Sequence, residues 1–293
     1  MSLKQILRGT GVAVVTPFDN NNKVDFPALD KLINFIISNG VEYIVTLGTT
    51  GETPVLSKEE KKEIVLATYA AVNKRVPVVV GIGGNDSYAV LDDFSNLPLE
   101  DATAILSASP YYNKPSQEGL FKHYELLASQ APKPLILYNV PGRTGRNMDA
   151  ATTLRLASEV KNIAGIKEAS GDMQQCMEIL KDCPADFLVV SGDDALALPQ
   201  LACGMDGVIS VAANALPRQF SDMVRACLSN DFATGKQLND KLIPAYNLMF
   251  AENNPAGVKA FLTELDILQN NVRLPVVPLS GELYKKVKRY LNT

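Results

Sequence analysis

A lysine lies near the end of a short apolar segment, Ile163 to Ser170, that has the pattern of a β-strand. Burying an ammonium group costs free energy unless the group is paired or loses its proton. Side chains alternate along a strand, so Gly165, Lys167 and Ala169 share one face, where the small neighbours leave room for a ligand. A desolvated amine in such a place can attack a carbonyl carbon. The alternative is a lysine that extends out of the strand end or pairs with a neighbouring carboxylate.

Seven further segments have the apolar character of strands, and none of them contains a lysine. The eight strand-like segments are Gly11 to Phe18, Tyr43 to Thr50, Val76 to Gly83, Ala102 to Pro110, Pro134 to Val140, Ile163 to Ser170, Phe187 to Asp193 and Gly207 to Asn214. Segments of helical periodicity separate them, and this alternation predicts a parallel sheet that closes into an α/β barrel. The rival is an open doubly wound sheet. Its usual glycine-rich turn does not follow the first segment, which ends in Thr16-Pro17-Phe18.

The helical segments carry start and stop signals. Pro27 lies in the first turn of the first helix, Asn39-Gly40 closes it, and Ser57 to Glu60 forms a capping-box pattern at the start of the second. After Asn230 the pattern changes to helices without strands. These helices are expected at Phe232 to Phe250, Pro255 to Leu268 and Gly281 to Leu291. We therefore expect a (β/α)8 TIM barrel over residues 1–230 and a C-terminal helical region over residues 231–293.

Polar residues follow several predicted strands, where an α/β barrel places its functional groups. Thr49 and Thr50 lie between two glycines after the second strand, and hydroxyl and N–H groups there could bind a carboxylate. Tyr138 lies in the fifth strand, next to the strand with Lys167, so we expect a phenol beside the amine. The alternatives are a plain turn for the threonines and packing at the barrel rim for the tyrosine.

Charged residues follow the fifth and seventh strands. Arg143 and Arg146 lie in one loop, and a guanidinium group can hold a carboxylate through two hydrogen bonds. One of these arginines is expected to be only a solvated loop charge. Asp193 and Asp194 lie where many barrels bind phosphate, so we expect a substrate other than a sugar phosphate.

Composition argues against several other classes of function. A net charge of -4 and a pI near 5.2 disfavour a nucleic-acid or anionic-membrane surface. The N-terminus lacks a signal-peptide pattern and no apolar run could span a bilayer, so we expect a cytoplasmic protein. The four cysteines contain no Cys-x-x-Cys pair and are expected to be free thiols. His123 is the only histidine, expected at the surface, which disfavours a histidine triad or a metal site.

Motifs along nearly the whole chain resemble those of a known family. They are Gly9-Thr10-Gly11 with Thr16-Pro17-Phe18, Gly48 to Glu52, Tyr138 to Gly145, Gly165 to Asp172, Ser191 to Asp194, Gly207 to Val211, and Arg273-Leu274-Pro275 with Pro278-Leu279. The chain resembles dihydrodipicolinate synthases, which belong with N-acetylneuraminate lyase to the pyruvate-dependent lyases. Arg143 is the feature that favours the first of these two branches.

The resemblance implies a lyase that condenses pyruvate with aspartate semialdehyde through a Schiff base on Lys167, without a metal or another cofactor. The product would be 4-hydroxy-tetrahydrodipicolinate, in lysine biosynthesis. Tyr138 would shuttle protons along a relay through Thr49 to Tyr112. In the family the Tyr112 position reaches into the neighbouring subunit's site, so the resemblance implies a dimer, usually paired into a tetramer.

Further residues are implied in substrate binding. Thr50 and the backbone at Ile209 would hold pyruvate, Gly192 belongs to the same set, and Arg143 would hold the carboxylate of the second substrate. Other readings are a pyruvate aldolase acting on a sugar acid, such as N-acetylneuraminate lyase, or a catalytically silent barrel that binds small carboxylates.

Three residues differ from the family pattern or have no assigned role. Lysine-inhibited relatives typically have glutamate where this chain has Ala89 and histidine where it has Lys58, so weak or absent inhibition by lysine is expected. Glu168 faces away from Lys167, and the sequence identifies no partner for it.

Overall fold

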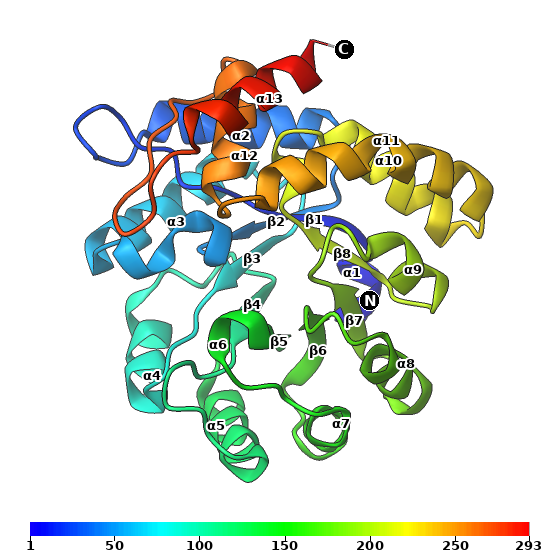
Figure 1. Ribbon diagram of the computed structural model, residues 1–293. Helices are drawn as coiled ribbons and strands as arrows, with labels where there is room; N and C mark the ends of the chain where they lie inside the picture. Colours follow the sequence, from blue (N-terminus) through cyan, green and yellow to red (C-terminus); the bar gives the residue numbers. More distant parts are fainter. Residues whose placement is uncertain (293) are drawn as a thin grey trace.

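A computed structural model describes residues 1–292 as a closed barrel of eight parallel strands in sequential order, with helices around it (Figure 1). The strands are β1 (Gly9–Ala13), β2 (Tyr43–Thr46), β3 (Val78–Gly81), β4 (Ala104–Ala108), β5 (Leu135–Asn139), β6 (Ile163–Glu168), β7 (Leu188–Ser191) and β8 (Gly207–Ser210). Strand β8 pairs with β1 and closes the sheet. The expected barrel is confirmed, and the open sheet is wrong.

Every strand ends earlier than the apolar segment that predicted it. The first also begins earlier, at Gly9. The residues beyond each strand end remain largely buried, and the first of them often still donates to the neighbouring strand, as Ala169 N–H does to the Asn139 carbonyl (2.9 Å). These extra residues form the loops of the barrel mouth.

Helices cover the outside of the barrel. They are α2 (Phe26–Ser38), α3 (Lys58–Val72), α4 (Ser87–Asn96), α5 (Gln117–Gln130), α7 (Ala150–Glu159), α8 (Met173–Asp182), α9 (Ala197–Ala202) and α10 (Pro217–Leu228). The capping box of α3 is confirmed, since Ser57 and Glu60 exchange hydrogen bonds between side chains and N–H groups. Short elements were not foreseen: α1 (Leu3–Ile6), α6 (Pro141–Thr144), and the 3-10 turns η1 (Thr49–Gly51), η2 (Thr53–Val55) and η3 (Ala212–Asn214).

Two hydrophobic cores hold the barrel together. One fills the interior, and the other lies between the strands and the outer helices. The interior core consists of Leu7, Ala13, Tyr43, Val45, Val79, Ala104, Leu106, Ile136, Tyr138, Val140, Leu188, Val190 and Ile209. Leu7 follows α1 and is fully buried, so the N-terminal segment contributes to this filling. The interior is therefore packed side chains and not a pore.

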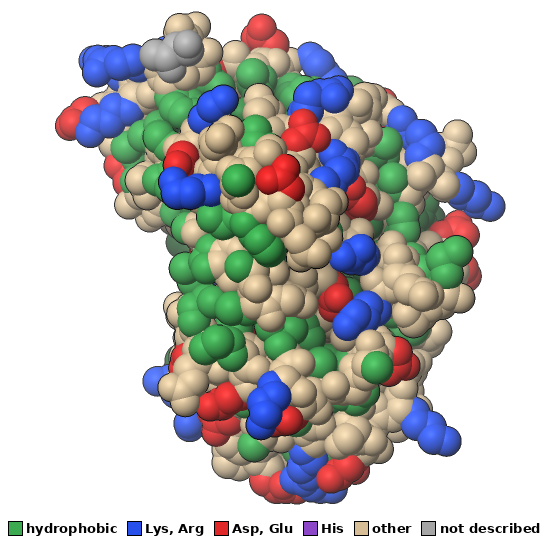
Figure 2. Space-filling model, turned by 90° about the vertical axis from the view of Figure 1, so that its right-hand side faces the viewer, with side chains coloured by type: hydrophobic (Ala, Val, Ile, Leu, Met, Phe, Trp, Pro, Cys, Tyr) green, Lys and Arg blue, Asp and Glu red, His purple; other side chains and the backbone are tan. Residues whose placement is uncertain are grey.

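Three helices follow the barrel: α11 (Phe232–Phe250), α12 (Ala256–Glu264) and α13 (Gly281–Leu291). Figure 1 shows them together on the side of the barrel that carries α2 and α10. Helix α11 packs mainly against α10. On the face shown in Figure 2, basic and acidic side chains are interspersed over the surface. Within residues 1–292, none of the helices is long and apolar enough to cross a membrane.

A buried ion pair fastens these helices to the loop after β2. Lys259 Nζ of α12 lies 2.6 Å from Glu52 Oε1, and both side chains are almost completely buried. The second Glu52 oxygen accepts a hydrogen bond from the Arg273 N–H (2.9 Å), and Lys259 also donates to the Asn271 carbonyl (2.8 Å). Burial lowers the pKa of Lys259, and the Glu52 carboxylate opposes this shift.

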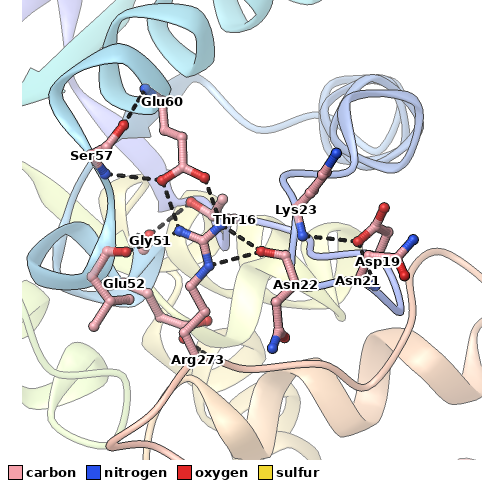
Figure 3. Close-up of polar contacts among 11 residues, drawn as sticks. Thr16, Asp19, Asn21, Asn22, Lys23, Gly51, Glu52, Ser57, Glu60 and Arg273 are labelled. Atoms are coloured by element: carbon pink, nitrogen blue, oxygen red, sulfur yellow. Dashed lines mark hydrogen bonds and ion pairs between the residues drawn. The ribbon is translucent and has the colours of Figure 1, made fainter.

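A second contact, between Arg273 and Glu60, lies nearer the surface. We call this contact and the buried ion pair of Lys259 with Glu52 the clamp. The Arg273 guanidinium donates two hydrogen bonds to Glu60 of α3, at 2.6 and 2.8 Å, and others to the Asn22 carbonyl (Figure 3). The cations of Lys259 and Arg273 both lie 4.3 Å from the centre of the Phe18 ring. The loop after β1, the segment from the β2 loop to the start of α3, and the C-terminal region around α12 are thereby joined.

The expected surface position of His123 is wrong. Its side chain is 6% exposed, on the face of α5 that packs inward, and Nδ1 lies 2.7 Å from Ser87 Oγ of α4. The helical pattern of α5 left this position ambiguous, because an imidazole suits either face. Burial lowers the pKa of His123 to about 4.

We predict that Lys259→Met destabilises the protein by roughly 3–5 kcal/mol, because Glu52 would remain buried without its cation. The double variant Glu52→Gln/Lys259→Met should recover much of this loss. Urea unfolding of the single and the double variant, at one protein concentration, measures both changes in stability. Lys236→Met, which removes an exposed ion pair with Asp240, is the control and should change little. If Lys259→Met were as stable as the parent protein, the ion pair with Glu52 would not have the stabilising role given to it here.

The buried histidine predicts a pH dependence of stability. Its pKa in the folded state lies below that of an unfolded histidine, so the unfolded chain binds the extra proton as the pH falls. The stabilisation is complete above about pH 6.5 and declines by up to about 3 kcal/mol towards pH 4. His123→Asn can still bond Ser87 but does not titrate. Urea unfolding of both proteins across this range should show a shallower decline for the variant, and parallel curves would contradict the prediction.

Candidate active site

A cavity of about 720 Å³ opens at the mouth of the barrel. It is lined by residues from the ends of β5 and β6, from the loops after β2, β5, β7 and β8, and from the last turns of α11. The lining residues are Thr49, Thr50, Tyr138, Val140, Gly142, Arg143, Lys167, Ala169, Gly192, Asp193, Ala195, Val211, Tyr246, Asn247, Phe250, Ala251 and Asn254. Seven of the residues singled out from the sequence thus meet in one place: Lys167, Tyr138, Thr49, Thr50, Arg143, Gly192 and Asp193.

Lys167 and Tyr138 lie opposite each other on neighbouring strands. Their Cα atoms are paired in the register of β5 and β6, so both side chains point into the barrel. Lys167 Nζ lies 4.3 Å from the centre of the Tyr138 ring. Lys167 is only 5% exposed, and among residues 1–292 its ammonium group has neither an ion pair nor a hydrogen bond. The alternatives of an extended or paired lysine are therefore wrong.

Gly192 provides the space for the lysine side chain. A Cβ atom at this position would lie 2.8 Å from Lys167 Cε and 2.7 Å from Ala169 Cβ. Real Cβ atoms do not approach this closely, so any larger residue would displace the lysine. Gly192 follows β7, which pairs with β6, and the sequence alone could not show which side chain it faces.

The loop after β2 is tied to the C-terminal helices at two points. Thr50 Oγ1 accepts a hydrogen bond from Asn254 Nδ2 (3.1 Å), and Glu52 belongs to the clamp described above. Thr50 is buried, whereas Thr49 is half-buried and faces the cavity. The 3-10 turn η1 thus places Thr49 in the lining of the cavity that also contains Lys167 and Tyr138.

The two arginines of the loop after β5 have different positions. Arg143 lies in α6, is exposed, and lines the cavity. Arg146 is instead directed to the Lys114 carbonyl, at 3.2 Å. Pro141 starts α6, and Gly145 ends it with φ of 74°, a conformation that favours glycine. This short turn, which was not foreseen, sets the direction of Arg143.

Asp194 supports the loop after β8. Its Oδ2 accepts hydrogen bonds from the N–H groups of Val211 (3.1 Å) and Ala212 (2.7 Å), at the start of η3. Burial raises the pKa of Asp194 to about 6. These two N–H groups are already paired with a carboxylate, which agrees with the expectation of a substrate that is not a sugar phosphate.

Two residues named from the resemblance do not line this cavity within one chain. Ile209 is 1% exposed and belongs to the interior core, and Val211 lines the cavity in its place. Tyr112 is 89% exposed and has φ of 70°, so its ring projects from the surface of the single subunit.

Sequence reasoning missed the wall formed by α11 and the turn after it. Tyr246, Asn247, Phe250 and Asn254 all lie on this wall. The amphipathic pattern of α11 predicted a helix, but it could not show that the end of this helix reaches the barrel mouth. The polar pair Asn253-Asn254 ahead of Pro255 was the available signal.

A second cavity of about 320 Å³ adjoins the first. The two share Thr49, Tyr138, Val140 and Arg143 in their linings, and the second also contacts Lys61 and Tyr111. Ala89 is exposed on α4 and does not line it.

Comparisons with known proteins agree with one another. Residues 6–293 match the sequence profile of the dihydrodipicolinate synthetase family. A 4-hydroxy-tetrahydrodipicolinate synthase from Parabacteroides distasonis is 45% identical over 286 residues, which cover 98% of this chain and 96% of the relative. The same enzyme from Cytophaga hutchinsonii is 48% identical over 281 residues, 96% of this chain and 94% of the relative.

A solved structure adds the fold to this agreement. Dihydrodipicolinate synthase from Acinetobacter baumannii, in a complex with pyruvate, is 38% identical and covers 98% of both chains with a TM-score of 0.94. The activity that follows from these full-length matches is that of a lyase, 4-hydroxy-tetrahydrodipicolinate synthase. With its barrel, its mouth lysine and these relatives, the chain belongs to the dihydrodipicolinate synthetase family.

Proposed function

We propose that Lys167 is the nucleophile of the synthase reaction and forms a Schiff base with pyruvate. The observation that carries this proposal is the buried ammonium group of Lys167, without a carboxylate partner in the described chain and beside the Tyr138 ring in the mouth cavity. The pyruvate complex of the Acinetobacter baumannii relative supports the choice of first substrate. Thr50, Gly192 and the backbone around Ile209 and Val211 are the proposed contacts of pyruvate.

The covalent sequence follows from the chemistry of an amine and a keto acid. The unprotonated Nζ adds to the ketone carbon, and the resulting carbinolamine loses water to give an iminium ion. This cation withdraws electrons, so a methyl proton leaves and an enamine forms. The enamine carbon then attacks the aldehyde of aspartate semialdehyde. The amine of that substrate displaces Lys167 as the ring closes, and the free lysine is restored.

Each of these steps moves a proton, and Tyr138 is the proposed carrier. Its phenol faces the same space as Lys167 Nζ, and Thr49 lines the same cavity. A hydroxyl chain from Tyr138 through Thr49 could pass the proton to Tyr112. Since Tyr112 projects from the surface of one subunit, we propose that it completes the site of a neighbouring copy, in a dimer that pairs into a tetramer.

Arg143 is the proposed anchor for the second substrate. It is the exposed cation of the cavity lining, whereas Lys167 lies deep in the barrel. A planar guanidinium binds a carboxylate through two hydrogen bonds and fixes its orientation. Aspartate semialdehyde held there would place its aldehyde between the rim and the enamine on Lys167.

We predict that Lys167→Arg remains folded but loses turnover, because a guanidinium cannot form the iminium. Borohydride reduction with pyruvate, followed by peptide mass mapping, should show an adduct on the Lys167 peptide of the parent protein and none in the variant. Lys161→Arg, an exposed lysine just before β6, is the matched control and should keep both adduct and activity. An adduct on another lysine would overturn the assignment.

The role of Arg143 predicts a difference between the two substrates. Arg143→Ala should raise KM for aspartate semialdehyde roughly tenfold or more, since a charge-assisted hydrogen bond is lost. KM for pyruvate should change far less. Initial-rate measurements with each substrate varied in turn test this, with Arg146→Ala as the control from the same loop. Equal effects on both substrates would indicate a general loss of loop structure.

A further inference from the structure

Glu168 is a completely buried carboxylate in β6 that the reaction as described does not use. Its oxygens accept hydrogen bonds from Asn139 Nδ2 (3.0 and 3.2 Å), Gln175 Nε2 (3.0 Å) and the Ser170 N–H (2.6 Å). No ion pair involves Glu168 within residues 1–292. A buried carboxylate held only by neutral donors is costly to keep, which raises the question of what it does.

The orientations of both side-chain amides are fixed by one backbone residue. The Met148 N–H donates to Asn139 Oδ1 (3.0 Å), so the NH2 group of Asn139 must face Glu168. The Met148 carbonyl accepts from Gln175 Nε2 (3.3 Å), which fixes the amide of Gln175 in the same way. Glu168 therefore faces donors alone, and this suits a carboxylate, which only accepts.

The partners of Glu168 connect the two strands of the catalytic pair. Asn139 directly follows Tyr138 in β5, and Glu168 directly follows Lys167 in β6; the Cα atoms of Asn139 and Glu168 are also paired in the ladder. Because successive side chains point to opposite faces, the bond between Asn139 and Glu168 lies behind the barrel wall from which Tyr138 and Lys167 point inward. Gln175 connects the same carboxylate to α8.

We propose that Glu168 is a positioning residue for the reaction, which fixes the β5 and β6 backbones so that Tyr138 and Lys167 Nζ stay in register. The inference rests on the roles proposed above for these two residues. Proton transfer and carbonyl addition both require correct relative placement within a fraction of an ångström. A flexible wall would leave the lysine in the cavity but lower the fraction of time spent in the reactive arrangement.

The test uses Glu168→Gln, which keeps the shape but directs an NH2 group at the surrounding donors. We expect Glu168→Gln to form the pyruvate adduct on the same residue as the parent protein, Lys167. The rate of adduct formation and kcat should both be lowered roughly tenfold or more. The rate is measured by borohydride quenching at short times, beside circular dichroism and the midpoint of thermal unfolding. Asp206→Asn is the control, because this buried carboxylate also accepts a backbone N–H, although it pairs with Lys4 as well, and it lies just before β8, away from the mouth. Asp206→Asn should be less stable than the parent protein, but its folded molecules should form the adduct at the parental rate.

A second variant keeps the test decisive if Glu168→Gln fails to fold. Gln175→Met removes one donor to Glu168 and should slow the same step by a smaller factor. The double variant should be less impaired than the product of the two single effects, as for residues that act as a unit. Normal rates of adduct formation in every one of these variants that folds, together with an adduct in the parent protein, would overturn this inference alone. If the parent protein forms no adduct on Lys167, the proposed function itself fails.

Discussion

The hydrogen bonding that closes β8 onto β1 is the constraint on which the rest of the structure depends. Gly9 and Gly207 face each other in this pairing, and a Cβ atom on Gly207 would lie 2.0 Å from the Gly9 carbonyl oxygen. Closure therefore requires glycine at this point. Once the sheet is closed, all eight strands end at one mouth, and residues separated by over a hundred positions in sequence, such as Thr49 and Lys167, line one cavity.

Two buried lysines show how the chain treats charge in different places. Lys259 has a carboxylate, a carbonyl and an aromatic ring around it, so its burial fastens the C-terminal helices to the β2 loop. Within residues 1–292, Lys167 has no carboxylate partner and lies beside the Tyr138 ring at the cavity. Stability alone would favour a partner for both. An amine without a carboxylate partner is suited to chemistry, and the surrounding fold must offset the free energy that its burial costs.

The C-terminal helices are part of the site as well as a support for it. Asn254 hydrogen-bonds Thr50, and the end of α11 forms one wall of the cavity. The ion pair between Glu52 and Lys259 ties α12 to the loop that carries Thr49 and Thr50. The barrel strands set the positions of Lys167 and Tyr138, whereas contacts between distant parts of the chain set the position of the threonines.

The sequence by itself determined the barrel, the order of its elements and the place of Lys167 in a barrel strand, because strand periodicity, helix caps and an isolated lysine in an apolar strand are local signals. It also placed Tyr138 beside Lys167, since consecutive strands of a barrel are neighbours. The family followed from motifs spread over the whole chain. Boundaries were less exact, because the residues beyond the strand ends remain largely buried and so resemble the strands themselves.

Only the tertiary structure decided the other features. The burial of His123, the space that Gly192 leaves for Lys167, the reach of α11 to the mouth and the donors around Glu168 all depend on contacts between distant segments. A one-dimensional pattern gives the face on which a side chain lies but not what packs against that face. For Glu168 the alternation correctly indicated the outer side of the barrel. The partners there come from β5 and α8, and only the packed fold brings them within hydrogen-bonding distance.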